Sequence, residues 1–163
     1  MVVREAARRW AVRAGRVAGY LDGKLEEDTF DYYAQDRSGN VWYFGEDTAQ
    51  YADGVVVGVE GAWITGVEGA RPGIVMPADP KLGTTYRQEF LLGTAEDAAQ
   101  VTSLTAPVSV PYDSFGKALR TREFSPLEPD ALEAKYYVKG VGQVLTIDLT
   151  NGEREALVRV VHR

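Results

Sequence analysis

Residues 28–50 read DTFDYYAQDRSGNVWYFGEDTAQ, and this stretch decides the fold. Two aromatic-rich, alternating segments flank residues 36–40, whose Asp, Ser, Gly and Asn are typical of a tight turn. The stretch therefore predicts a β-hairpin. Because successive side chains of a strand point to opposite faces of a sheet, we expect aromatic and acidic side chains on opposite faces. This arrangement indicates an aromatic interior with a carboxylate-lined mouth.

Alternating segments recur along the chain, at residues 41–46, 86–91 and 144–149. In the first of these, strict alternation puts Tyr43 and Glu46 on opposite faces of the sheet. Turn signals separate the segments, at residues 22–23, 38–40, 53–54 and 151–152. Short alternating segments with tight turns and no long helical pattern predict an all-β fold, an antiparallel meander forming a barrel or a strongly curved half-barrel. The length of 163 residues fits a single domain over residues 1–163.

Two segments depart from the alternating pattern. Residues 1–19 leave helix and strand equally open, because small and apolar residues recur there at helical spacing, so the fold includes at most one short helix. Residues 66–83 carry three prolines and four glycines, which predicts a long structured loop. Its apolar centre, residues 74–76, is expected either to plug one end of a barrel or to fold over that end as a lid, with Arg71 beside it.

Composition excludes several classes of function. The net charge is −6, and residues 1–24 hold six Lys and Arg against two Asp and Glu (+4), which leaves −10 on residues 25–163. An acidic body repels phosphate backbones, so nucleic acid is not an expected partner. The chain has no cysteine and a single histidine, His162, so we expect no transition metal and no cofactor. No apolar run is long enough for a transmembrane segment.

Several longer motifs carry a resemblance to a known group of proteins. They are YYAQDRSGNVWYFGEDT at 32–48, MPADP at 76–80, GTTYRQE at 83–89, VPYDSF at 110–115 and KYYVKGVGQV at 135–144. Over residues 20–150 the chain resembles uncharacterised bacterial secreted or lipoprotein-like β proteins. Two of the motifs, VPxxxF and YYxxGVGxV, are also similar to those of half-barrels of the lipoprotein-carrier type.

The resemblance implies a curved antiparallel sheet, an extracytoplasmic or secreted location, and a ligand such as an acyl chain. We expect no export signal at the start of the chain itself, because its basic first segment lacks the continuous hydrophobic stretch of a signal peptide. Gln143 stands where the pattern has an aliphatic residue, and Ala134 stands where it has a larger polar one. These departures would fit a trimmed, altered or engineered version of the domain. The group has no agreed catalytic residues to carry over.

Three functions remain open, and the first is a binding module for a small apolar or amphipathic molecule held in an aromatic-lined interior. The second is a cofactor-independent hydrolase, lyase or cyclase, and the third is a structural protein whose interior is filled by side chains. Burial raises the pKa of a carboxyl among aromatic rings, which favours Glu89 and Glu46 as candidates for a general acid or base. Arg87 is the candidate for an electrophilic partner of such a carboxyl. The simpler expectation for Arg87 and Glu89 is a surface ion pair. The predicted ligand-binding residues are Tyr33, Trp42, Trp63, Arg71, Met76, Tyr86, Gln88 and Tyr136.

Overall fold

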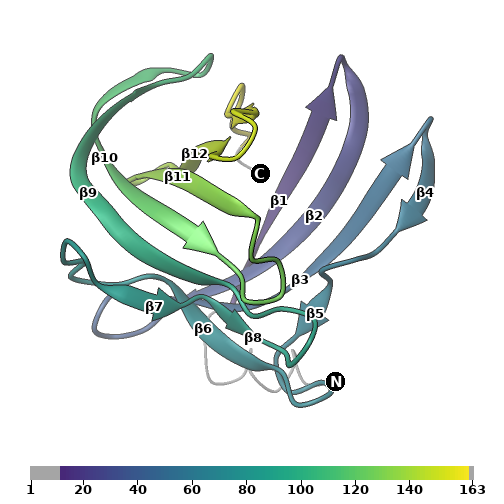
Figure 1. Cartoon of the computed structure of the whole chain (residues 1–163), viewed down its shortest axis with the longest axis horizontal. Helices are drawn as coiled ribbons and strands as arrows, with labels where there is room; N and C mark the ends of the chain where they lie inside the picture. The colour runs from purple at the N-terminus through teal and green to yellow at the C-terminus, as the bar shows by residue number, and fades with distance from the viewer. Residues whose placement is uncertain (1–11, 162–163) are drawn as a thin grey trace. The chain divides into compact units, whose positions relative to one another are not determined.

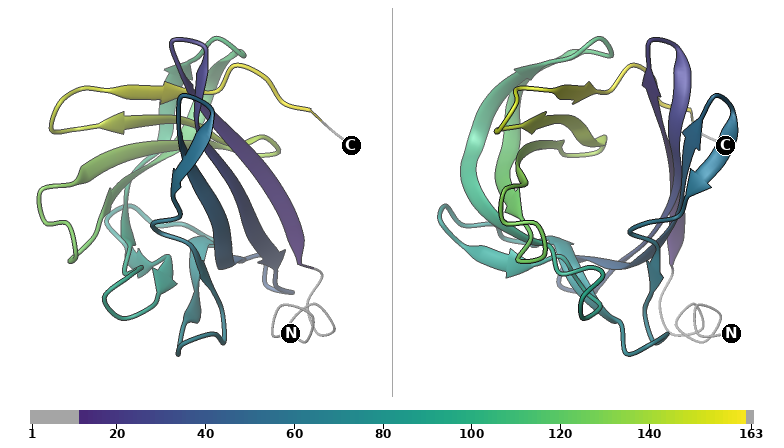
Figure 2. Two further views of the ribbon diagram at one scale, coloured as in Figure 1. Left: turned by 90° about the vertical axis from the view of Figure 1, so that its right-hand side faces the viewer. Right: turned by 45° about the vertical axis from the view of Figure 1, so that its right-hand side comes forward.

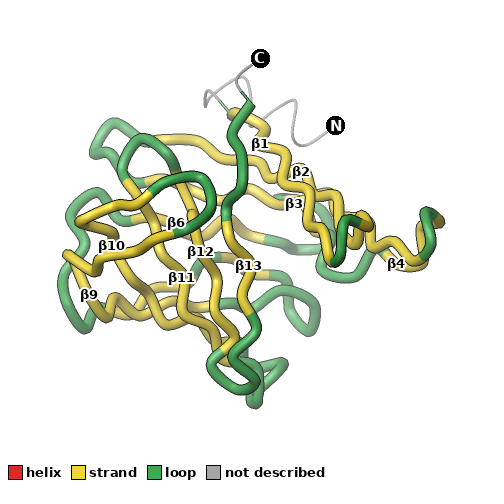
Figure 3. The backbone as a smooth tube through the Cα atoms, turned by 90° about the horizontal axis from the view of Figure 1, so that it is seen from above, coloured by secondary structure: helices red, strands yellow, loops and turns green. Residues whose placement is uncertain are grey.

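The computed structural model describes residues 12–161, and within them the chain forms strands, turns and loops without a helix (Figure 3). The chain divides into two compact units. The first comprises the chain up to Asp79 together with Arg87–Glu96, and the second comprises Pro80–Tyr86 and Asp97–Arg163. Each unit is built on its own antiparallel sheet.

The sheet of the first unit is built around its longest hairpin, β2 (Lys24–Gln35) and β3 (Val41–Ala52) (Figure 1). Its strand order is β1, β2, β3, β6 and β8, and two short strands also pair with β3. The remaining strands are β1 (Arg13–Leu21), β4 (Val55–Gly58), β5 (Trp63–Ile64), β6 (Arg71–Met76) and β8 (Glu89–Phe90). The central strand β3 therefore receives partners along both of its edges.

The sheet of the second unit follows the order β13, β12, β11, β10, β9 and β7. Its strands are β7 (Thr85–Arg87), β9 (Ala98–Ser109), β10 (Ser114–Phe124), β11 (Leu132–Val138), β12 (Gly142–Asp148) and β13 (Arg154–Ala156). Three register shifts interrupt the pairing of β9 with β10, and both strands curve strongly (Figure 2). Val108, Ala118, Val144 and Leu145 form the buried apolar core of this unit.

The predicted all-β antiparallel fold is confirmed, and neither sheet closes on itself. The ambiguity over residues 1–19 is settled from Arg13 onward, where β1 is a strand; residues 1–11 lie outside the described part. The single domain remains a prediction. None of the described residues forms an apolar helix of membrane-spanning length.

The expected loop at residues 66–83 is wrong over its centre, because Arg71–Met76 is the strand β6. This strand pairs with β3 on one side and with β8 on the other, so it is a part of the sheet and not a lid. Gly73 favoured the prediction of a loop, but in the sheet it allows two strands to approach closely. A Cβ atom at Gly73 would lie 2.3 Å from the backbone carbonyl of Gln88.

The turn of the β2–β3 hairpin is organised by Asp36. Its carboxylate accepts hydrogen bonds from the backbone N–H groups of Ser38 (2.8 Å) and Asn40 (3.0 Å). It also accepts from the Asn40 side chain (2.8 Å) and from the Trp42 indole N–H (2.9 Å). The bonds from Trp42 and Asn40 lower the pKa of Asp36 to about 2. The predicted hairpin and its turn are thus confirmed, with local hydrogen bonds as the cause.

A β-bulge in β3 corrects the predicted assignment of faces. Tyr33 pairs with Tyr43 and Tyr32 pairs with Gly45, so Phe44 is an extra residue in β3. Asp31 then pairs with Glu46, and the bulge brings Glu46 onto the same face as Tyr43. The prediction that acidic and aromatic side chains occupy opposite faces is therefore wrong at this point of the sheet.

Candidate functional site

The bulge assembles a group of acidic and aromatic side chains on one face of the first sheet. The Tyr43 hydroxyl lies 2.6 Å from Asp31 Oδ1 and 3.0 Å from Glu46 Oε2. Asp31 comes from β2, whereas Tyr43 and Glu46 come from β3 on either side of the bulge. One phenol oxygen is therefore within hydrogen-bonding distance of two carboxyl groups from neighbouring strands.

Three aromatic rings pack beside these groups. The rings of Tyr33 and Tyr43 stack with their centroids 5.0 Å apart, and the Trp63 ring meets Tyr43 edge-on at 5.4 Å. The indole N–H of Trp63, on β5, donates to Glu89 Oε2 on β8 at 2.7 Å. We call this set the acid–aromatic cluster; its members are Asp31, Tyr33, Tyr43, Glu46, Trp63 and Glu89.

The cluster is mostly buried. Trp63 is 3% exposed, Asp31 and Glu89 are each 8% exposed, and Tyr43 is 9% exposed. Tyr33 and Glu46 are partly exposed. Burial, together with the charges of Asp31 and Glu46, raises the pKa of Tyr43 far above its ordinary value. The phenol therefore stays protonated at any physiological pH and acts as a hydrogen-bond donor.

Four of the residues predicted from the sequence belong to this cluster. They are Tyr33 and Trp63, from the ligand-binding prediction, and Glu46 and Glu89, from the catalytic one. Arg87 is the last residue of β7, and Glu89 is the first residue of β8. The Arg87 guanidinium lies over the Phe90 ring at 4.5 Å, while Glu89 is buried against Trp63. The expected surface pairing of Arg87 with Glu89 is therefore wrong, because Glu89 is not a surface residue.

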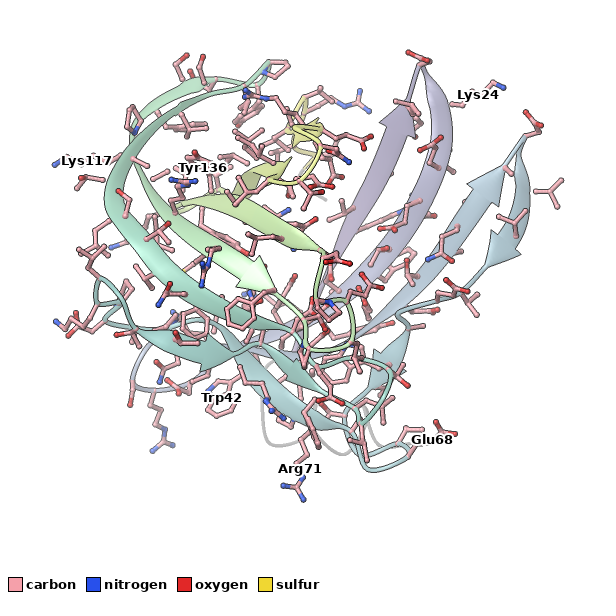
Figure 4. All side chains as sticks on the ribbon, in the orientation of Figure 1. Lys24, Trp42, Glu68, Arg71, Lys117 and Tyr136 are labelled. Carbon is pink, nitrogen blue, oxygen red and sulfur yellow. The ribbon has the colours of Figure 1, made fainter. Side chains whose placement is uncertain are left out.

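The other predicted ligand-binding residues of the first unit are not among the members of the cluster defined above. Trp42 precedes Tyr43, so its ring points to the opposite face of β3 from Tyr43. Its indole N–H donates to the Asp36 carboxylate of the turn. The Trp42 side chain is labelled in Figure 4. Arg71 is exposed at the start of β6, and Met76 ends that strand beside Val41. Gln88, the one residue that separates β7 from β8 in the sequence, is buried.

Tyr86 and Tyr136 belong to the second unit. Burial and the charge of Glu123 raise the pKa of the Tyr86 phenol above its ordinary range. The Tyr136 ring packs against the apolar core of that unit, and the Arg120 guanidinium lies 5.7 Å from its centroid. Neither tyrosine is a member of the acid–aromatic cluster as defined above.

Sequence reasoning missed Asp31 and Tyr43, the two residues at the centre of the cluster. Alternation alone cannot place Tyr43 beside Glu46, since the two are three positions apart in a strand. A usable signal was present in Gly45, because a glycine inside an aromatic strand often marks a bulge. Gly45 has a φ of +135°, and a Cβ atom there would lie 2.2 Å from the Trp63 carbonyl oxygen. The bulge, in which Phe44 is the extra residue before Gly45, reverses the faces that strict alternation assigns to Glu46 and to the residues up to Gln50.

The second unit contains an ion-pair network of its own. The Lys135 ammonium lies 3.2 Å from Glu123 Oε2 and 3.2 Å from Glu133 Oε2. Glu123 Oε1 accepts hydrogen bonds from the hydroxyls of Thr121 (2.7 Å) and Tyr137 (2.8 Å). Burial lowers the pKa of Lys135, but the charges of the two glutamates outweigh it and hold the pKa above its ordinary value. The polar atoms of this network satisfy one another, which is typical of a structural role.

An open hollow lies at the turns of two hairpins in the first unit, lined by Lys24, Leu25, Asp53 and Gly54. The Lys24 ammonium pairs with Asp53 there at 3.0 Å, on the exposed surface. None of the predicted ligand-binding residues lines this hollow. Within residues 12–161, no group of three or more acidic or histidine side chains has an arrangement suited to a metal ion. His162 lies outside the described residues.

Comparisons with known proteins add no family. No protein-family model matches the chain, and neither curated proteins nor solved structures include a significant match.

Proposed function

We propose that this protein is a binding module for a small amphipathic molecule, and that the acid–aromatic cluster of the first unit recognises it. The observation that carries the proposal is the joining of stacked aromatic rings to carboxyl groups at one place, with Tyr33 and Glu46 partly exposed. Aromatic rings with polar tips suit a ligand that is partly buried and partly hydrogen-bonded. The resemblance to half-barrels that bind acyl chains supports the same class of ligand and an extracytoplasmic or secreted location.

The chemistry of the cluster narrows the polar end of the ligand. Carboxylate oxygens accept hydrogen bonds and carry negative charge, so a group that donates hydrogen bonds is favoured over an anion. The net charge of −6 disfavours anionic ligands as well. The ligand expected is therefore an apolar or aromatic body that ends in a neutral or basic N–H or O–H group.

N-Phenyl-1-naphthylamine is a suitable probe, because it is neutral, apolar and carries one N–H donor. We expect its fluorescence to rise saturably on addition of the protein. Glu46→Gln removes the charge that strengthens the hydrogen bond and should weaken binding about tenfold. A fluorescence titration of both proteins gives the two dissociation constants.

Glu26→Gln is the matched control, since Glu26 is an exposed carboxyl of the same sheet. It should leave the dissociation constant unchanged. The absence of saturable binding by the parent protein, or equal weakening in both variants, would rule the proposal out. If the parent protein shows no saturable binding, the result would support a protein whose interior is filled by side chains and has a purely structural role.

A second function is favoured by one particular observation, the contact of the Tyr43 hydroxyl with both Asp31 and Glu46. A carboxyl pair joined through a phenol can accept a proton at one oxygen and donate one from another. This supports a cofactor-independent enzyme, and among hydrolase, lyase and cyclase the hydrolase has the simplest chemistry. Water would add to the carbonyl carbon of an ester as a carboxylate takes its proton, and the alcohol would leave with a proton from the acid.

The hydrolase hypothesis predicts that the protein accelerates the hydrolysis of 4-nitrophenyl butyrate. The release of 4-nitrophenol measures the rate. Glu46→Gln should lower the rate constant about 100-fold or more, the usual effect of losing a general acid or base. Glu26→Gln should leave the rate unchanged. A parent rate equal to that of buffer alone would exclude ester hydrolysis and leave the binding proposal to be decided by its own titration.

A further inference from the structure

Two arginines of β10, Arg120 and Arg122, have no acidic partner among the residues that the structure describes. Within residues 12–161, no carboxylate forms a salt bridge with either guanidinium. The Nε atom of Arg120 is buried, yet it has no hydrogen-bond partner. Most buried N–H groups of folded proteins have an acceptor, because leaving one unpaired is costly. The acceptor that Arg120 lacks has to come from outside these residues.

The pairing of β10 with β11 puts both arginines on one face of the second sheet. Arg120 pairs with Tyr136 and Arg122 pairs with Ala134, without a register shift between them. Residues two positions apart in a strand have their Cα atoms about 6.5–7 Å apart. Two guanidinium groups at this spacing can both donate hydrogen bonds to one anion.

The acidic side chains of these two strands are engaged on the opposite face. Glu123 follows Arg122 in the strand, so the two point to opposite faces. Glu123 and Glu133 are the acidic residues of β10 and β11, and each has its Oε2 atom 3.2 Å from the Lys135 ammonium. The two glutamates therefore neutralise Lys135 and leave the charges of Arg120 and Arg122 uncompensated.

Aromatic rings hold the two guanidinium groups without using their N–H donors. Arg120 lies 5.7 Å from the ring centroid of Tyr136, which is labelled in Figure 4, and Arg122 lies 5.7 Å from that of Phe124. A ring covers one flat side of a guanidinium, and the N–H groups at its edge stay available. Arg122 is exposed and Arg120 is partly exposed, so a ligand can approach them from solvent.

The charge of the second unit does not oppose an anion. This unit holds nine Lys and Arg against nine Asp and Glu, so its net charge is zero and the whole charge of −6 belongs to the first unit. The repulsion that disfavours an anionic ligand at the acid–aromatic cluster is therefore weaker at the two arginines.

We propose that Arg120 and Arg122 form a binding site for a phosphate group, carried either by inorganic phosphate or by a small phosphate ester. A phosphate group with a charge of about −1.5 to −2 at pH 7 matches two guanidinium charges, and its oxygens can accept from both side chains. A carboxylate supplies only one negative charge. This site is separate from the acid–aromatic cluster, since all of its residues belong to the second unit.

Nitrogen-15 NMR tests the site directly, because the arginine Nε–H groups give signals of their own. Inorganic phosphate is titrated into the protein at about 0.15 M sodium chloride, which screens non-specific attraction. We expect a saturable shift of the Arg120 and Arg122 signals. Sodium acetate at the same ionic strength should bind about tenfold more weakly, because one negative charge is missing. A phenyl phosphate titration that saturates at lower concentration than inorganic phosphate would identify an ester as the ligand.

Two variants test the roles of the arginines in that titration. Arg122→Gln changes an exposed side chain and should raise the dissociation constant for phosphate about tenfold or more. Arg120→Lys keeps the positive charge but loses the planar pair of donors, so it should also weaken binding. Arg159→Gln is the matched control, since Arg159 is an exposed arginine of the same unit, and it should leave the dissociation constant unchanged.

Three results would overturn the proposal. They are the absence of a saturable shift at Arg120 and Arg122, equal dissociation constants for phosphate and acetate, and equal weakening by Arg122→Gln and Arg159→Gln. The test leaves the binding function of the first unit undisturbed, because it uses a different probe and observes signals of the second unit alone.

Discussion

The variant Gly45→Ala is expected to lose about 4 kcal/mol or more of unfolding free energy, a range reached only by strained or clashing core positions. The φ of Gly45 is +135°, a backbone conformation that residues with a side chain rarely adopt. The added Cβ would lie 2.2 Å from the carbonyl oxygen of Trp63 and 2.9 Å from the Cα of Ile64. Backbone atoms of a paired strand cannot move away without breaking the pairing of β3 with β5. Urea denaturation measures the loss.

Gly15→Ala is the matched control for that prediction. Gly15 lies in β1 of the same sheet, and a Cβ atom there would be 3.9 Å from the Tyr33 ring, an ordinary contact. This variant should be unchanged or more stable by about 0.4–1 kcal/mol, since alanine restricts the unfolded chain. Similar losses in the two variants would show that the close contact at Gly45 does not govern the bulge.

The variant Trp63→Ala is expected to cost about 3–5 kcal/mol for the lost ring, as is usual for a buried aromatic side chain. Trp63 is 3% exposed and packs edge-on against Tyr43. Its truncation also removes the indole donor to the buried carboxyl of Glu89, which adds about 1–3 kcal/mol. Denaturation of the variant and the parent by urea gives the difference.

Trp63→Phe separates the two contributions, because it keeps an aromatic ring and removes the N–H donor. It should cost about 1.5–3 kcal/mol, the usual contribution of a hydrogen bond to a charged group. In the double variant with Glu89→Gln, the cost of Trp63→Phe should be smaller, since the buried acceptor then has no charge. A loss below about 1 kcal/mol for Trp63→Ala would instead indicate a ring that borders open space, as in a ligand pocket.

Gly45→Ala and Trp63→Ala test two different contributions to the acid–aromatic cluster. Gly45 determines which face of β3 receives Glu46, whereas Trp63 determines how the buried carboxyl of Glu89 is satisfied. Loss of Gly45 is expected to disturb both the fold and the contact of Tyr43 with Glu46. Loss of Trp63 is expected to reduce stability while leaving the contact of Tyr43 with Asp31 and Glu46 in place.

The candidate site was only partly predictable. Glu46 and Glu89 were identified because a carboxyl among aromatic residues is a plausible acid or base, and Tyr33 and Trp63 because amphipathic rings suit binding sites. Asp31 and Tyr43 were missed. Their importance follows from the pairing of β2 with β3, which no local pattern expresses.

Local sequence patterns determined the all-β class and the β2–β3 hairpin. The alternation of residues 41–44 and the hydrogen bonds of Asp36 act within a few residues, so the chain needs no distant partner to favour them. The strand at Arg71–Met76 and the face occupied by Glu46 were decided by tertiary structure alone. Gly73 looks like a loop residue in the sequence, and Gly45 looks like an ordinary residue of an alternating strand. In the folded sheet both occupy strand positions where the paired backbones approach too closely for a side chain. Such close contacts join residues far apart in the chain, and for this reason only the folded sheet reveals them.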